Sequence, residues 1–225
     1  MENHFTHHQQ DLAFLKDRLL LMAGHAEGSV NKAIRALMER DGVLARQIKE
    51  EDQVIDNFEI EIDELCLRQL ARAPLASDLR FITVAMKISR DLERIGDEAT
   101  TISRRVLELN SEAQLKPYID IPRMARLALD MLKEALDAFV SRDSNRARLL
   151  IPRDKEVDAI HKQLQRELVS YMIENPSTIT RALNLMTISK AIERIADHAT
   201  NIAEEVVFNC EGLDIRHSAS ALQDS

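Results

Sequence analysis

The sequence of 225 residues is poor in the residues that build turns, strands and disulfide frameworks. It contains five glycines, five prolines, no tryptophan and 4% aromatic residues, so it offers little turn chemistry and few aromatic strand formers. Its two cysteines, Cys66 and Cys210, are widely spaced, which argues against a disulfide framework or a CxxC metal site. No apolar run is long enough to span a bilayer and no signal peptide is visible, so we expect a cytoplasmic protein without a transmembrane segment.

Charge and helix-forming residues dominate what remains. Charged residues make up 30% and hydrophobic residues 45% of the chain, a balance typical of a globular protein with long helices. The formal net charge is −8, so the chain as a whole is poorly suited to neutralising nucleic-acid phosphates, and we expect no nucleic-acid partner. No GxxxxGK[ST], GxGxxG or GxSxG motif occurs, so nucleotide binding and serine hydrolase chemistry have no support.

Sparse turn signals divide the chain into helical segments. RDG at 40–42 and RDSN at 142–145 each place an aspartate before a new helix, where its side chain can cap the first turn. Apolar residues between the turns recur at alternating steps of three and four, the spacing of one helix face. The predicted helices cover residues 9–39, 43–72, 77–110, 122–141, 146–173 and 177–210.

The second half of the chain repeats the first. ERIGDEATTI at 93–102 returns as ERIADHATNI at 193–202, and an independent match at an offset of 102 relates the second helix to the fifth. Short connections make consecutive helices antiparallel. We therefore predict an all-α fold of six long antiparallel helices in two pseudo-symmetric three-helix bundles, with residues 1–113 as the first repeat. Residues 114–225 form the second repeat and a short C-terminal tail.

Acidic residues four apart survive in both copies of the repeat. Glu93 and Asp97 lie one turn apart on one helix face, away from the apolar seam, and so do Glu193 and Asp197. A single acidic pair is usually just solvated, but core packing does not explain four pairs at duplicated positions. The remaining carboxylate and imidazole groups expected to face these pairs are Asp52, Asp56 and Glu59 on the second helix, and Asp154, Asp158 and His161 on the fifth.

Such concentrations of like charge are costly unless water or a cation neutralises them. Oxygen ligands suit Mg, Ca, Mn or Fe, and an added imidazole favours Fe, Mn or Zn. Arg94 and Arg194 are alternative counter-charges beside the pairs. Gly96 and Ala196 allow either close approach of a ligand or close helix packing. Pro152 comes just before Asp154, so it either redirects that side chain or splits the fifth helix.

Several of these stretches together resemble one known family. LERIGDEATTI and IERIADHATNIAEEV are similar to the two copies of the signature of the PhoU family, which regulates bacterial high-affinity phosphate uptake. DQVIDNFEIEIDELCLRQL and LASDLRFI resemble its second-helix motif and the segment that follows. GLDIRH at 212–217 resembles its C-terminal ending. The resemblance covers nearly the whole chain and implies the fold derived above.

The resemblance also implies a set of ligands and a role. E/DxxxD motifs bind multinuclear iron or zinc clusters in some relatives, and carried over by position they pair Asp52 and Asp56 with Glu93 and Asp97, and Asp154 and Asp158 with Glu193 and Asp197. Asn201 offers an amide oxygen where the first copy has Thr101, so we expect the first site to bind metal more weakly.

The implied role is a non-enzymatic negative regulator that acts when phosphate is plentiful. Family members connect the phosphate ABC transporter at the inner membrane face to a sensor histidine kinase and restrain both. We therefore expect a homodimer that reaches the membrane only through these partners. The rival interpretations are a metal-dependent enzyme, such as a phosphatase or oxidase, and a metal-free helical scaffold. No ExxH motif occurs, which disfavours a ferritin-like oxidation site.

Overall fold

The computed structural model describes the backbone of residues 2–71 and 75–216, and side chains from residue 9 onward within these ranges. The described residues form helices and no strand, which confirms the all-α prediction. The expected turn at Pro74 and the last residue of the C-terminal motif, His217, lie outside the described residues. The long helices are α1 (Glu2–Glu39), α2 (Gly42–Leu70), α3 (Ala76–Leu109), α4 (Asp120–Ser141), α6 (Asp154–Glu174) and α7 (Ile179–Glu211).

The fifth predicted helix is interrupted. A short helix, α5 (Ser144–Leu150), is followed by a 3₁₀ turn at Ile151–Arg153 and then by α6. Pro152 lies in this turn, because a proline cannot donate the backbone hydrogen bond that an uninterrupted α-helix requires. Leu150, Ile151 and Asp154 nevertheless keep right-handed helical dihedral angles. Of the two outcomes that the sequence left open for Pro152, the structure shows a split of the helix predicted over 146–173, with the direction of the chain preserved.

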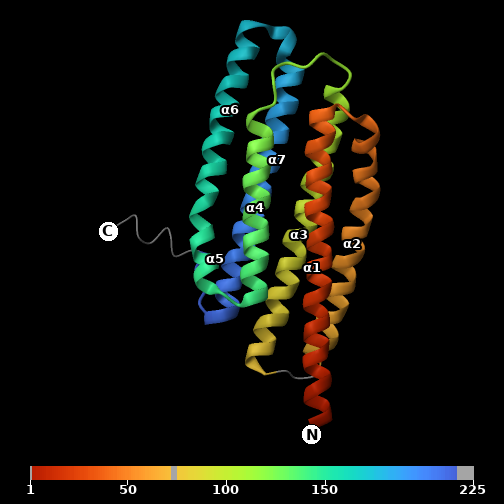
Figure 1. Cartoon of the computed structure of the whole chain (residues 1–225), viewed down its shortest axis with the longest axis vertical. Helices are drawn as coiled ribbons and strands as arrows, with labels where there is room; N and C mark the ends of the chain where they lie inside the picture. Colours follow the sequence, from red (N-terminus) through yellow and green to blue (C-terminus); the bar gives the residue numbers. More distant parts are fainter. Residues whose placement is uncertain (1, 72–74, 217–225) are drawn as a thin grey trace, which may run out of the picture.

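Two sets of helices pack through α3 and α7. α1, α2 and α3 contact one another, and α4, α5 and α6 each contact α7. Figure 1 shows the long helices nearly parallel to the long axis of the molecule, with α4 and α1 in front of α7 and α3. The most extensive contact between the two sets is the one between α3 and α7, whereas α1 and α4 touch less. The contact between α3 and α7 is therefore the main connection between the two sets of helices.

The apolar seams predicted for α3 and α7 fill the core. Every residue of both seams is buried, because neighbouring helices cover each seam along its length. The buried residues are Phe81, Ala85, Ile88, Leu92, Ile95, Ala99, Ile102, Val106 and Leu109 in α3, and Leu185, Ile188, Ile192, Ile195, Ala199, Ile202 and Val206 in α7.

The turns that begin α2 and α5 have matching geometry. Asp41 Oδ1 accepts hydrogen bonds from the backbone of Val43 and Leu44, and Asp143 caps α5 in the same way through the Arg146 backbone. Arg40, just before the first cap, has a φ of 56°, and Arg142 has a φ of 53° at the matched place. The duplication thus extends to a left-handed residue that ends the preceding helix.

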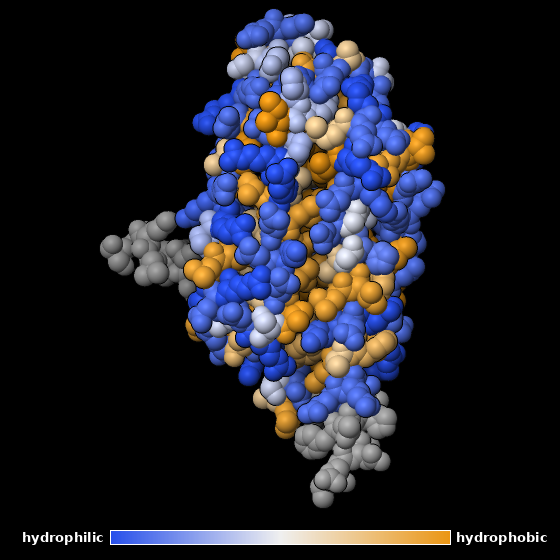
Figure 2. All heavy atoms as spheres, in the orientation of Figure 1, coloured by the Kyte–Doolittle hydropathy of each residue, from blue (hydrophilic) through white to orange (hydrophobic). Residues whose placement is uncertain are grey.

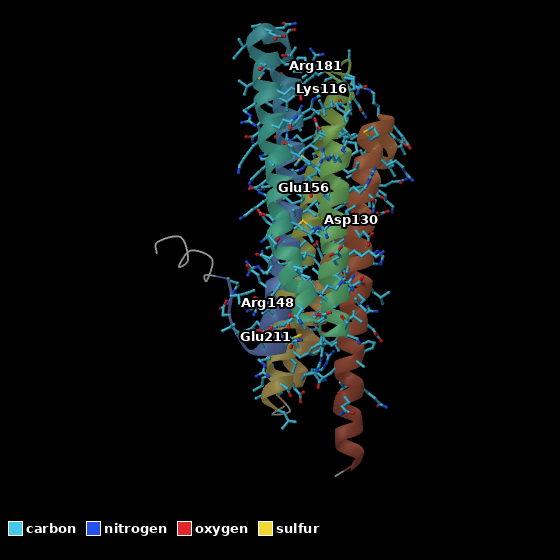
Figure 3. The ribbon with its side chains drawn as sticks, turned by 60° about the vertical axis from the view of Figure 1, so that its left-hand side comes forward. Lys116, Asp130, Arg148, Glu156, Arg181 and Glu211 are labelled. Carbon is cyan, nitrogen blue, oxygen red and sulfur yellow. The ribbon has the colours of Figure 1, made fainter. Side chains whose placement is uncertain are left out.

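Ion pairs fix both ends of the second bundle. Lys116, in the connection between α3 and α4, lies with its Nζ atom 2.5 Å from Glu167 Oε2 on α6. At the opposite end, Arg148 Nη2 on α5 lies 2.6 Å from Glu211 Oε2 at the end of α7. Figure 3 shows Arg181 near Lys116 at one end and Arg148 near Glu211 at the other. These contacts hold the short α5 and the long connection against α6 and α7.

The face that carries α1 and α4 is partly apolar. Figure 2 shows apolar surface among the polar side chains over these two helices. On α1, Phe14, Leu21 and Met38 are each about half exposed. No helix among the described residues is long and apolar enough to cross a membrane.

Candidate metal centres and the groove between them

The first acidic cluster forms where α2 and α3 approach closely at Gly96. A Cβ atom at this position would lie 2.8 Å from Ile55 Cδ1 and 3.2 Å from Asp52 Oδ1. The absence of a side chain therefore lets the α2 carboxylate lie directly against α3. Of the two interpretations of Gly96, the structure shows close helix packing, which also brings Asp52 toward Asp97.

We define the first cluster as Asp52, Asp56, Glu59, Glu93 and Asp97. Burial, followed by the charges of Asp56 and Asp97, raises the pKa of Asp52. Burial and then the charge of Asp97 raise the pKa of Glu93 to about 7, with smaller contributions from Glu59 and Asp56. Carboxylates of α2 and α3 therefore act on each other directly. The structure brings together the five residues that the sequence singled out here.

Arg94 supplies an internal counter-charge to this cluster. Its Nη1 atom donates to Asp97 Oδ2 at 3.0 Å, and its Nε atom lies 3.4 Å from Glu93 Oε2. Half of its side chain remains exposed. Any cation that binds Glu93 and Asp97 must therefore compete with a guanidinium group that is already in place.

The second cluster consists of Asp154, Asp158, Glu193 and Asp197, on α6 and α7. Burial, followed by the charges of Asp158 and Glu193, raises the pKa of Asp154. Burial, then Glu193 and Asp154, raise the pKa of Asp197 to about 6. Glu193 is almost buried because α6 covers it, and it pairs with Lys190. Asp154 thus stays within the cluster despite the turn that precedes it.

The second cluster is neutralised differently from the first. Arg194, which matches Arg94 in the repeat, crosses to the other repeat and donates its Nη1 atom to Glu98 Oε1 at 3.1 Å. Glu98 has no counterpart, because the second copy has His198 at that position. Asp197 makes no ion pair with any described residue, but Asp158 pairs with Lys162 and Glu193 pairs with Lys190, so lysines take the place that Arg94 has in the first cluster.

His161 lies beside the second cluster, but its ring nitrogens are engaged. Nδ1 lies 3.0 Å from Ser189 Oγ, and Nε2 lies 2.9 Å from Gln165 Nε2. The Ser189 hydroxyl in turn donates to the Met186 carbonyl at 2.9 Å. Burial lowers the pKa of His161, so a neutral ring with both nitrogens hydrogen bonded fits this environment. Both ring nitrogens of His161 are thus occupied in this arrangement, and His161 could serve as the metal ligand expected from the sequence only if one of these hydrogen bonds broke.

Asn201 also lies apart from the α6 carboxylates. Its Nδ2 atom donates to Asp91 Oδ1 on α3 at 3.3 Å, and its side chain is exposed along the α3–α7 contact. Asn201 can reach a cation only by rotating away from Asp91.

Glu59 lies at the edge of the first cluster. Burial, and next the charge of Asp63, which is not part of the cluster, raise the pKa of Glu59.

Buried oxygen atoms lie in and beside these clusters, and some of them have no partner. Within the described residues, Asp154 Oδ1 and Thr200 Oγ1 are buried and have no hydrogen-bond partner, whereas the Thr100 hydroxyl faces Asp52 and opposes the rise in the pKa of that carboxyl. No three His, Cys, Asp or Glu side chains of these residues already stand in positions to hold a metal ion together. An oxygen-rich set with raised pKa values and unsatisfied oxygens suits a hard or borderline cation after side-chain rotation.

Thr100 and Thr200 are candidate site residues that the sequence prediction missed. They occupy the same position in the repeat, three residues after Asp97 and Asp197, and therefore share a helix face with these carboxylates. Their identity in both copies was a visible signal. A buried threonine hydroxyl is common in helix packing, however, so only the contact of Thr100 with Asp52 and the missing partner of Thr200 distinguish them.

Comparison with known proteins gives consistent matches along the chain. The profile of the PhoU domain matches twice, over residues 19–106 and 121–206. The chain is 44% identical over 219 residues to the "Phosphate-specific transport system accessory protein PhoU homolog" of Pseudomonas aeruginosa, covering 94% of this chain and 90% of that protein. It is 35% identical over 208 residues to the "Phosphate-specific transport system accessory protein PhoU" of Escherichia coli, covering 92% and 86%.

Solved structures share the fold. The crystal structure of PhoU from Pseudomonas aeruginosa superposes with a TM-score of 0.88 at 42% identity and covers 91% of this chain and 99% of that one. The phosphate transport system regulatory protein PhoU from Streptococcus pneumoniae gives 0.86 at 28% identity, covering 92% and 99%.

Proposed function

The chain belongs to the PhoU family, and we propose that it is a non-enzymatic negative regulator of phosphate uptake. Its relatives in Pseudomonas aeruginosa and Escherichia coli are named accessory proteins of the phosphate-specific transport system. By this proposal the chain acts at the cytoplasmic face of the inner membrane, bound to the phosphate ABC transporter and to a sensor histidine kinase. It restrains both when phosphate is plentiful.

The observation that supports a metal-dependent regulator is the pair of facing carboxylate clusters, the second of which also contains buried oxygens without partners. The residues that would hold the cations are Asp52, Asp56, Glu59, Glu93 and Asp97 with Thr100 in the first cluster, and Asp154, Asp158, Glu193 and Asp197 with Thr200 in the second. Asn201 would join the second after rotation. Iron, zinc or manganese, as single or multinuclear centres, suits these donors, and magnesium or calcium suits the oxygen atoms.

A bound cation would supply positive charge that offsets the repulsion between facing carboxylates. The facing helices would then be held together more firmly, and the acidic surface would be masked. Because the clusters lie between α2 and α3 and between α6 and α7, this change would alter the surface offered to a partner without a change of fold. The chain would report the state of the clusters to the transporter and kinase through that surface.

We also propose that the protein forms a homodimer through the face of α1 and α4. Phe14 and Leu21, each about half exposed and seven residues apart on α1, share one side of that helix and support this surface, since exposed apolar area commonly marks a protein–protein contact. Sedimentation velocity of the purified chain tests this directly: Phe14→Ser with Leu21→Ser shifts the species from dimer to monomer. A wild-type monomer at micromolar concentration would contradict it.

Regulation is tested in a deletion strain grown at high phosphate. We expect expression of phosphate-starvation genes to rise, because the restraint on the kinase is lost. Complementation with the wild-type gene restores repression, and complementation with Asp97→Ala/Asp197→Ala does not. Normal repression in the deletion strain would refute the regulatory proposal.

Metal content is tested on the purified protein by elemental analysis. Asp97→Ala removes metal from the first cluster and Asp197→Ala from the second. Asp130→Ala, an exposed carboxylate on α4 labelled in Figure 3, is the matched control and retains wild-type content. Unchanged metal content in the cluster variants would contradict these ligand assignments.

A further inference from the structure

A polar groove runs along the contact between α3 and α7. It consists of three neighbouring hollows of about 550, 480 and 460 Å³. The first and second share Glu98 and Arg194, and the first and third share Arg94, His198 and Asn201. The hollows are therefore continuous, and each has a size that accommodates a small ligand.

The groove has buried acids and exposed bases. The Glu98 and Glu205 side chains are only 11% and 5% exposed, whereas those of Arg94 and Arg194 are 50% and 54% exposed. Six basic side chains line the three hollows against four acidic ones. The bases are Lys87, Arg90, Arg94, Lys190, Arg194 and Arg216, and the acids are Asp91, Glu98, Asp197 and Glu205. A chain with a net charge of −8 thus presents cationic groups to solvent here.

The central hollow gathers hydrogen-bond donors from both repeats. Arg94 and Arg194, at matched positions, both line it, together with His198 and Asn201. Each arginine carries five N–H donors, and Arg194 commits one nitrogen to Glu98. His198 uses only Nδ1, which lies 2.8 Å from Asp91 Oδ1. Two planar guanidinium groups that meet in one hollow suit the oxygen atoms of a tetrahedral anion.

Besides Glu98, which is paired with Arg194, two carboxylates oppose an anion in this hollow, and both belong to the metal clusters. Asp197 lines the hollow itself. Asp97, with Glu93, holds Arg94 toward the first cluster. A cation on the second cluster would neutralise Asp197, and a cation on the first would release Arg94. Metal loading would thus increase both the positive charge and the number of donors in the hollow.

The geometry points to a binding site for a dianionic tetrahedral oxyanion of the phosphate class in the central hollow, held by Arg94 and Arg194 and strengthened when the flanking clusters are neutralised. The metal-linked half of this inference rests on the proposed function. Because coupling between two sites is reciprocal, the oxyanion would also strengthen metal binding. This linkage would join phosphate level to the state of a regulator that has no phosphate-cradling loop.

The test uses full-length protein freed of metal with a chelator, so that phosphate cannot bind to a metal ion instead. Asp97→Asn/Asp197→Asn mimics neutralised clusters without metal. Isothermal titration with inorganic phosphate is expected to show affinity about tenfold or more above that of metal-free wild type. Equal affinity in the two proteins would overturn the inference, whether or not the wild-type chain binds metal. If the wild-type chain takes up no metal, only the proposed metal role is overturned.

Variants of the arginines locate the site. Arg94→Gln or Arg194→Gln, added to Asp97→Asn/Asp197→Asn, is expected to lower phosphate affinity about tenfold or more. Because Arg194→Gln leaves the buried Glu98 without its ion-pair partner, the double variant Arg194→Gln/Glu98→Gln is measured as well. Arg105→Gln, on α3 but paired locally with Glu108, is the matched control and leaves affinity unchanged. Retained affinity in all groove variants would place phosphate elsewhere and overturn the inference.

A second arm distinguishes the source of the oxyanion. Inorganic phosphate is compared with a phosphoserine peptide under the same conditions. Tighter binding of inorganic phosphate assigns the site to the free anion, and tighter binding of the peptide assigns it to a phosphorylated partner. Either order supports the oxyanion site, whereas an unphosphorylated glutamate-rich peptide that binds as tightly as both would overturn it.

Discussion

Arg94 Nη1 lies 3.0 Å from Asp97 Oδ2, within the first carboxylate cluster and at the edge of the groove. The matched Arg194 instead donates to Glu98 across the α3–α7 contact. The same residue type therefore neutralises a candidate metal ligand in one repeat and a buried glutamate in the other. The two clusters, although they derive from one repeated sequence, are expected to respond differently to metal.

Removal of Arg94 is expected to strengthen metal binding at the first cluster. In Arg94→Gln a cation no longer has to displace a guanidinium group, so its affinity is expected to rise about two- to fivefold, because a half-exposed ion pair is worth roughly 0.5–1 kcal/mol. A zinc titration in an Asp197→Ala background, which silences the second cluster, measures this. Arg105→Gln serves as control. An unchanged first-cluster affinity would show that the Arg94 pairs do not compete with metal.

The pH dependence of stability reports the buried carboxylates in metal-free protein. Burial, and next Asp97, raise the pKa of Glu93 from 4.5 to about 7 on folding. Between these values the folded chain binds more protons than the unfolded chain, so this group lowers stability as the pH rises from 4.5 to 7. Glu93→Gln is therefore expected to melt at a higher temperature than wild type at pH 8, with a difference that shrinks toward pH 5.

Thermal unfolding with a chelator present measures this difference. Glu108→Gln, an exposed glutamate further along α3, is the control. A melting difference for Glu93→Gln that is the same at pH 5 and pH 8 would show that Glu93 titrates normally.

Metal removal is expected to lower the melting temperature. A cation at a hundred times its Kd stabilises the folded chain by about 2.7 kcal/mol. For a chain of this size that corresponds to roughly 5–10 °C. Asp97→Ala/Asp197→Ala is expected to melt at the same temperature with and without metal, and Asp130→Ala to behave as wild type. A melting temperature of the wild type that is insensitive to metal would argue for the metal-free scaffold.

Substitution of Gly96 tests whether close packing of α2 and α3 shapes the first cluster. Gly96→Ala gains about 1 kcal/mol of helix propensity but introduces a Cβ atom against Ile55 and Asp52, a form of overpacking that costs about 1–3 kcal/mol. We expect little net change in stability and weaker metal binding at the first cluster, because Asp52 is pushed aside. Ala196→Gly is the reciprocal control, and it is expected to leave the first cluster unaffected.

His161 is expected to matter for stability and not for metal. His161→Ala leaves Ser189 and Gln165 without their buried partner, which costs about 1–3 kcal/mol. Urea unfolding measures that loss, and elemental analysis of the same variant is expected to show wild-type metal content. A specific loss of second-cluster metal would restore the interpretation of His161 as a ligand.

The repeated sequence was sufficient to predict the helices and the faces that meet. The three- and four-residue spacing from Phe81 to Leu109 marks a continuous buried seam, and the antiparallel arrangement follows from short connections. The approach of Asp52 to Asp97 could be predicted for the same reason, since both lie on helix faces fixed by those seams. These features depend on the spacing of residues within each helix, so the sequence alone is sufficient to predict them.

The partners of Arg94, Arg194 and His161 could not be predicted. Which carboxylate each arginine reaches depends on how the two repeats pack through α3 and α7, which no local pattern records. The orientation of His161 depends on Ser189, 28 residues away in the sequence. Pro152 offered two outcomes, and helical dihedral angles around the turn preserve the direction of the chain. The side-chain partners that depend on long-range packing therefore could not be predicted, although the path of the backbone could.

The antiparallel contact of α3 with α7 has an evolutionary consequence. In a dimer of identical single repeats, two-fold symmetry would place the same residue at position 98 of both halves. Fusion of the halves into one chain removes that restriction. Position 98 is then free to be a glutamate that receives Arg194, and its counterpart a histidine that binds Asp91. A repeat held within one chain can therefore have an interface with two distinct halves, as positions 98 and 198 show.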